Sequence, residues 1–239
     1  MLHVFGCSFS IAHDHKNDIV GEGGMNPTFV PIEHTWTELV SKHLIGTTEH
    51  NNTALCGVGN DYIFDTFTNT LPKIQKGDYV IVQPTSFLRE WMFEDRPEMA
   101  NFLSAKYEVG LHINQPESDA LELYRNHLYS EHKQKIVYNA FMQAFFSWAI
   151  PFGEINVKML ILPGFHTIDG VEGALIDPSH REIGNDKAVQ KHMARTGGDN
   201  RYNHFSEVNH KVLANKVIDF FDNATQVDLT TDFITANKE

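Results

Sequence analysis

The chain begins with the apolar run Leu2-His3-Val4-Phe5-Gly6-Cys7, and Ser8 follows it directly. Further short apolar runs lie at residues 51–55, 79–83 and 157–162, the first of them the weakest. Runs of this length with β-branched and aromatic side chains are typical of strands that are buried on both faces. Such strands favour a parallel sheet covered by helices on each side.

Apolar residues at helical spacing occupy the segments between and after these runs, at residues 31–44, 61–74, 116–149 and 206–221. Strand and helix therefore alternate, which predicts an α/β fold: a three-layer α/β/α sandwich with a five-stranded parallel sheet, flavodoxin-like in its layers. We expect the strand order 2-1-3-4-5. The fifth strand has two candidates, residues 174–176 and 227–229.

Length and composition favour one soluble domain. The 239 residues carry 41% apolar side chains and a net charge of −12, so a core can form and binding to nucleic acid or an anionic membrane surface is disfavoured. No apolar run is long enough to span a membrane, the N-terminus lacks the features of a signal peptide, and the two cysteines fit a reducing compartment. We expect a cytoplasmic protein with one domain over residues 1–239, and a helical insertion at about 88–150 that caps the site.

Ser8 is the first candidate for chemistry. It follows the first strand, where Gly6 permits a tight turn, and the polar loops 11–29 and 165–198 lie where ligands bind open α/β sheets. A serine in this place is suited to nucleophilic attack, and its own N–H is suited to binding an oxyanion. The alternative is a serine that only caps a helix or shapes a turn.

Two further segments are candidates. Gly57 and Gly59 form a turn between the second strand and its helix, which can direct N–H groups at an anion or simply connect two elements. The full spacing of a nucleotide-binding glycine motif is missing. His204 precedes the last helix and is placed to act as a general base, although any one of 14 histidines is more often a surface residue.

In combination these segments resemble the SGNH (GDSL-type) hydrolase superfamily, in the form met in SGNH-like proteins of phages and bacteria. Gly6-Cys7-Ser8-Phe9-Ser10 looks like the block G-D-S-x-[ST] with Cys7 in place of Asp. Asn52 and Gly57 match the second block, whose glycine helps to bind the oxyanion. His204, followed by Val212-Leu213-Ala214, matches the spacing of the last block.

The resemblance implies the SGNH hydrolase fold and a serine esterase that needs no cofactor. Ser8 is then the nucleophile and His204 the base. The acid expected at position 201 is replaced by Arg201, so Asp199, or alternatively a backbone carbonyl, orients the imidazole. Gly57 contributes an N–H to the oxyanion.

Strand three lacks the family's oxyanion asparagine and runs into Gln83-Pro84-Thr85-Ser86. The substitutes are a hydroxyl of Thr85 or Ser86, or the amide of Asn60. Losing one oxyanion donor costs about 10²–10³-fold in rate.

The substrate expected from this reading is an acetyl or short-chain acyl ester of a carbohydrate or other small molecule. Arg89 is a candidate for holding a substrate carboxylate, or for pairing with a neighbouring acid. His13 is a candidate for lining the cleft. No spacing typical of a metal site is present, so we expect no metal. The alternatives are an SGNH-like binding or structural module with weak or no catalysis, and an acyltransferase that uses the same serine.

Overall fold

The computed structural model describes residues 1–7, 9–10, 34–55, 58–87, 89–90, 123, 127–128, 130–164, 205 and 207–233. The strands are β1 (Leu2–Phe5), β2 (Asn51–Asn52), β3 (Tyr79–Val82) and β4 (Lys158–Ile161). The helices are α1 (Trp36–Ile45), α2 (Asn60–Thr70), the 3₁₀ turn η1 (Leu71–Lys73), α4 (Glu131–Ser147), α5 (Ala149–Glu154) and α8 (Glu207–Asn223).

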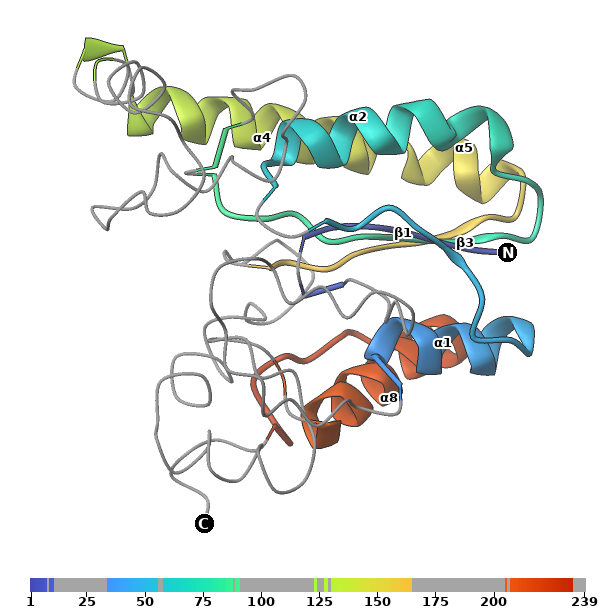
Figure 1. Cartoon of the computed structure of the whole chain (residues 1–239). Coiled ribbons are helices and arrows are strands. Elements are labelled where there is room, and N and C mark those ends of the chain that lie inside the picture. The colour runs from blue at the N-terminus through green and yellow to red at the C-terminus, as the bar shows by residue number, and fades with distance from the viewer. Residues whose placement is uncertain are drawn as a thin grey trace, which may run out of the picture.

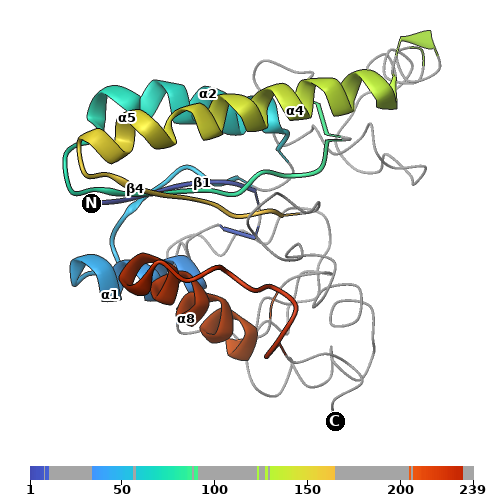
Figure 2. The same ribbon diagram turned by 180° about the vertical axis from the view of Figure 1, so that it is seen from behind.

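The four strands form one all-parallel sheet in the order β2-β1-β3-β4. Phe5 lies beside Val82, which lies beside Ile161, so the three longer strands end at the same level. Helices α2, α4 and α5 cover one face of the sheet, and α1 and α8 cover the other (Figures 1 and 2). The α/β alternation and parallel pairing predicted from the sequence are confirmed.

The predicted fifth strand is not found among the described residues. One candidate, 174–176, lies outside them. In the other, 227–229, only Asp228 forms an isolated bridge, although Val227 and Leu229 are buried. This segment therefore contributes apolar side chains to the core without joining the four-stranded sheet.

Local hydrogen bonds set the ends of α1, which begins later than apolar periodicity predicts. Thr35 is the N-cap, and its hydroxyl accepts from the N–H of Glu38 while the Glu38 carboxylate accepts from the N–H of Thr35 at 2.7 Å. This reciprocal capping fixes the first turn at Trp36. Gly46 ends the helix with φ of 78°, a left-handed conformation that glycine adopts at little cost.

Helix α4 falls within the predicted helical insertion and is part of a helical layer of the sandwich. Helix α4 lies beside α2 over the sheet (Figure 1), and the ring of Phe64 contacts Phe141 and Phe145 at 5.2 and 5.4 Å between centroids. The predicted cap over about 88–150 stays a prediction. Residues 91–122 of the insertion lie outside the described part.

Aromatic side chains fill the space between the sheet and the upper helices. Phe67 of α2 is fully buried and contacts Phe5, Phe145, Trp148 and Phe152 with ring centroids 5.3–6.3 Å apart. Edge-to-face pairs of this kind contribute about 0.5–1.5 kcal/mol each beyond their buried area. On the other face, Tyr79 contacts Phe221 of α8 at 5.2 Å. The described helices include none that is long and apolar enough to cross a membrane.

Candidate functional site

The carboxyl edge of the sheet has a topological switch point between β1 and β3. The chain leaves β1 towards α1 on one face, whereas it leaves β3 towards α4 on the other (Figures 1 and 2). In open α/β sheets, ligands bind outside the carboxyl ends of the strands at such a switch point. The segments after Phe5 and after Val82 lie at this edge.

A tight turn follows β1. The N–H of Ser10 donates to the carbonyl of Cys7 at 2.9 Å, which closes the turn. Beyond the last paired residues of β1 and β3, the N–H of Gln83 still donates to the carbonyl of Phe5 at 2.7 Å. The backbone is therefore fixed on both sides of position 8.

Asn52, at the end of β2, holds this turn from the side. Its amide nitrogen donates to the carbonyl of Ser10 at 2.6 Å and to Nε2 of His50 at 3.2 Å, and its amide oxygen accepts from the N–H of Ala54 at 2.9 Å. Burial lowers the pKa of His50, although a hydrogen bond to the carbonyl of Thr48 and the charge of Glu38 oppose the shift. A neutral His50 keeps Nε2 available as the acceptor for Asn52.

Phe9 connects the turn to α1 and to the segment before α8. Its carbonyl accepts from Nε1 of the buried Trp36 at 2.6 Å, and its ring meets that of Phe205 at 5.9 Å between centroids. Nδ1 of His210 in α8 accepts from the N–H of Trp36 at 3.1 Å. The turn after β1 is thereby packed against the N-terminal end of α8.

Asn60, the first residue of α2, clamps the loop that follows β3. Its amide nitrogen donates to the carbonyls of Thr85 and Ser86 at 3.1 and 3.2 Å, and its amide oxygen accepts from the N–H of Thr85 at 2.8 Å. Asn60 and Thr85 are both buried. Both N–H groups of the Asn60 amide are thus engaged by the backbone, so donation to an oxyanion requires it to release one of them.

Arg89 extends the same cluster. Its Nη1 donates to the hydroxyl oxygen of Thr85 at 2.7 Å, which leaves the Thr85 proton available for another acceptor. The next residue, Glu90, accepts from the side-chain amide of Gln134 on α4 at 2.8 Å. The loop is held by α2 on one side and by α4 on the other.

The sequence-predicted residues divide into two groups. Asn60, Thr85 and Arg89 are brought together by the hydrogen bonds described above. The remaining five, Ser8, His13, Gly57, Asp199 and His204, lie outside the described residues. Each keeps the role predicted for it as a prediction.

Gln83 also lies at this edge, and no role was predicted for it from the sequence. Its side chain is fully buried, and within the described part of the chain its Nε2 atom has no hydrogen-bond partner. An unpaired buried polar group costs about 1–3 kcal/mol. The signal in the sequence is a polar amide that ends the apolar run Tyr79–Val82 of a central strand.

A polar pair lies at the opposite, amino edge. Nε2 of the buried His3 donates to the carboxylate of Asp78 at 3.1 Å, and its Nδ1 accepts from the amide of Asn51 at 3.0 Å. Burial lowers the pKa of His3 and outweighs the raising effect of Asp78. Burial alone would raise the pKa of Asp78, but hydrogen bonds from the Met1 amine, the N–H of Gln75 and His3 lower it.

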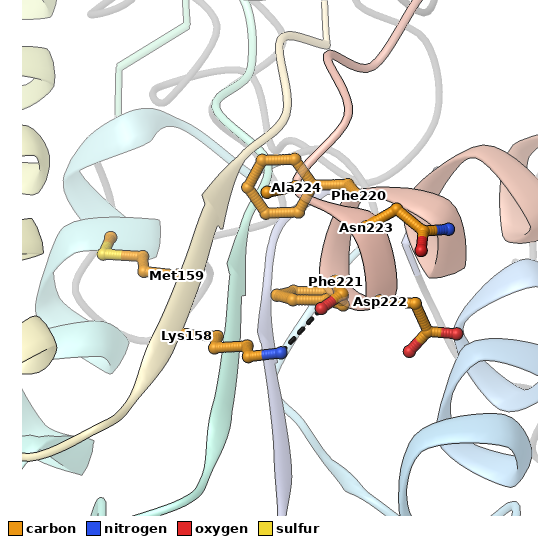
Figure 3. Close-up of a pocket in the computed structure, with 7 residues that line it drawn as sticks. All are labelled: Lys158, Met159, Phe220, Phe221, Asp222, Asn223 and Ala224. Carbon is orange, nitrogen blue, oxygen red and sulfur yellow. Dashed lines mark hydrogen bonds between the residues drawn. The ribbon is translucent and has the colours of Figure 1, made fainter.

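A cavity of about 470 Å³ opens between the start of β4 and the end of α8 (Figure 3). Lys158 lines the cavity, and its ammonium group donates to the carbonyl of Phe221 at 2.6 Å. Lys158 lies level with Tyr79, so this cavity is at the amino ends of the strands and is separate from the switch point.

The described residues define an α/β protein with a four-stranded, all-parallel sheet between two helical layers. In the described ranges no three ligating side chains form a group that could hold a metal ion. Comparison of the chain with protein-family models, curated proteins and solved structures found no match.

Proposed function

We propose that the protein is a serine esterase of SGNH type that hydrolyses an acetyl or short-chain acyl ester of a small molecule or carbohydrate. The proposal includes the finer fold of that superfamily, a flavodoxin-like sandwich with a fifth strand. Its working residues are Ser8, His204 and Asp199, with Gly57 and a donor from the loop after β3 at the oxyanion.

One observation carries the proposal: the contact between Phe9 and Phe205 at 5.9 Å. Phe9 follows the proposed nucleophile Ser8 in the sequence and Phe205 follows the proposed base His204, so a neighbour of each makes this contact although almost 200 residues separate them. A nucleophile and a base must come within hydrogen-bond reach of each other. Contact between Phe9 and Phe205 is what a catalytic pair of Ser8 and His204 requires of the adjoining residues.

The mechanism follows from these roles. Ser8 Oγ attacks the acyl carbon while His204 takes its proton, and Asp199 stabilises the imidazolium. The bond to the alcohol breaks as His204 returns the proton to the leaving oxygen. Water, deprotonated by His204, then attacks the acyl-enzyme and releases the carboxylic acid and free Ser8.

A catalytically weak binding module is the second candidate. It is favoured by Asn60, whose two amide hydrogens are already engaged by the carbonyls of Thr85 and Ser86. An acyltransferase would use the same serine and differ only in the acceptor of the acyl group.

Hydrolysis of short p-nitrophenyl esters tests the proposal. The wild type should turn over p-nitrophenyl acetate, and Ser8→Ala should lose at least about 10³-fold in kcat/KM because the nucleophile is gone. Ser147→Ala, which removes an exposed serine on α4, is the matched control and should retain full activity. Activity that survives in Ser8→Ala would overturn the esterase proposal, and no activity in the wild type would favour the binding module.

A further inference from the structure

The amide of Gln83 has two N–H donors that nothing in the described structure accepts. The side chain is fully buried, so bulk water does not satisfy it either. Buried amides in folded proteins almost always have partners, and one without a partner calls for a physical explanation. One such explanation is that the acceptor is an atom of the substrate, which is present only when the substrate is bound.

The orientation of this amide is set by its oxygen. The hydroxyl of Ser10 donates to Oε1 of Gln83, and the thiol of Cys7 lies 3.9 Å from the same atom. Both donors lie within two residues of Ser8 in the sequence. Because they converge on Oε1, the NH₂ group is left to point elsewhere, with both of its hydrogens available.

Glycines on both neighbouring strand ends allow the main chain to approach Gln83. A Cβ atom at Gly6 would lie 3.1 Å from Cβ of Gln83 and 3.0 Å from Ser10 Oγ, and one at Gly164 would lie 3.8 Å from Cγ of Gln83. Gly6 precedes Ser8 by two residues, and Gln83 is level with Gly6 at the switch point. The amide thus sits at the carboxyl edge between two closely packed backbones.

We infer that the Gln83 amide donates a hydrogen bond to the acyl oxygen of the ester as that oxygen gains negative charge. The inference rests on the proposed function and adds a catalytic residue to it. A neutral NH₂ fixed by two contacts needs no reorganisation when charge develops, and exclusion of water strengthens its hydrogen bond. It also supplies the donor that strand three otherwise lacks.

Phosphonylation kinetics test this role. A fluorophosphonate forms an adduct with an activated serine, and its phosphonyl oxygen takes the place of the acyl oxygen. Gln83→Met keeps the volume and removes the donors, so the rate constant for labelling Ser8 should fall about 10²–10³-fold. The unfolding midpoint should fall as well, because the buried Ser10 hydroxyl loses its acceptor. Thr70→Val is the matched control: Thr70 is also buried and donates to the carbonyl of Thr66 at the C-terminal end of α2, so its loss should lower the unfolding midpoint and leave labelling unchanged.

The outcomes separate the two proposals. If the wild type forms no adduct at Ser8, the proposed function fails and this inference fails with it. If the wild type is labelled and Gln83→Met is labelled equally fast, only the role of Gln83 is overturned.

A measurement on the wild type covers the case in which Gln83→Met does not fold. The side-chain ¹⁵N–¹H₂ signals of Gln83, assigned through bonds, should move on phosphonylation, with one proton shifted downfield by its new hydrogen bond. Signals that stay in place in a fully labelled sample would overturn the inference.

Discussion

The ring of Phe9 meets the ring of Phe205 edge to face, with 5.9 Å between centroids and an angle of 69° between planes. Both side chains are buried, and Phe205 also stacks on Phe233 at 6.2 Å. The contact joins the turn after the first strand to the approach of the last helix. The proposed pairing of Ser8 with His204 requires this junction.

A double-mutant cycle measures the junction directly. Phe9→Leu and Phe205→Leu should each destabilise the fold, and their effects should be non-additive by about 0.5–1.5 kcal/mol, the coupling expected of an aromatic pair. Urea unfolding of the two single variants and the double variant gives the coupling. Phe146→Leu, at a partly exposed phenylalanine of α4, is the control and should show no coupling with Phe9→Leu. Additive effects of Phe9→Leu and Phe205→Leu would contradict the contact.

The Asn60 clamp predicts a large loss of stability. Asn60→Ala removes three hydrogen bonds to Thr85 and Ser86 and leaves buried backbone groups unpaired, so unfolding should cost about 2–4 kcal/mol less. Asn69→Ala in the same helix removes an exposed bond to Asp65 and should change stability by less than about 0.5 kcal/mol. Chemical denaturation of both variants checks this, and equal effects would show that Asn60 does not hold the loop.

Gly164 predicts a steric effect. A Cβ atom there would overlap the carbonyl oxygen of Pro84, which is backbone and cannot move aside, so Gly164→Ala should destabilise by about 1–3 kcal/mol. Gly153 in α5 has open space around it, and Gly153→Ala should be neutral or stabilising by up to about 1 kcal/mol. Thermal unfolding compares the two. A Gly164→Ala variant as stable as the wild type would mean that the ends of β3 and β4 are not in close contact.

The strands were the part of the fold that the sequence predicted best. A short, continuous apolar run such as residues 79–83 has apolar side chains on both faces, and a central strand of a covered sheet buries both. The ends of the helices and strands depended on hydrogen bonds that the spacing of apolar residues does not predict. The Thr35–Glu38 capping pair starts α1 at Trp36, and only two residues of the weak second run pair with β1. Residues 227–229 are apolar enough for a strand, but they pack against the core outside the sheet. Burial of a segment does not by itself decide whether the segment forms a strand.

At the candidate site, sequence indicated the right edge of the sheet but not the partners within it. Thr85 and Asn60 were expected to face an oxyanion, and the structure shows them bonded to each other across 25 residues. Long-range hydrogen bonds of this kind have no signature in the local sequence. No role was predicted for Gln83 for the same reason: an amide at a strand end does not stand out in the sequence, and only the structure shows that its nitrogen has no partner among the described residues.

His3 predicts a pH dependence of stability. Its pKa in the folded state lies below 6.5, so below that pH the unfolded chain binds more protons than the folded one. Stability should therefore be full above about pH 6.5 and should fall as the pH decreases towards the lower, folded-state pKa. Urea unfolding between pH 4 and 8 measures the slope, which should be smaller in His3→Gln. An identical slope in the variant would remove His3 from the explanation.

Intact-mass spectrometry after fluorophosphonate treatment tests the central claim, an activated Ser8, most directly. The account predicts one adduct on the wild type that maps to Ser8, is absent from Ser8→Ala and is lost or strongly slowed in His204→Ala. Ser147→Ala should be labelled like the wild type. A wild type that stays unmodified, or an adduct that persists in Ser8→Ala, would contradict the account.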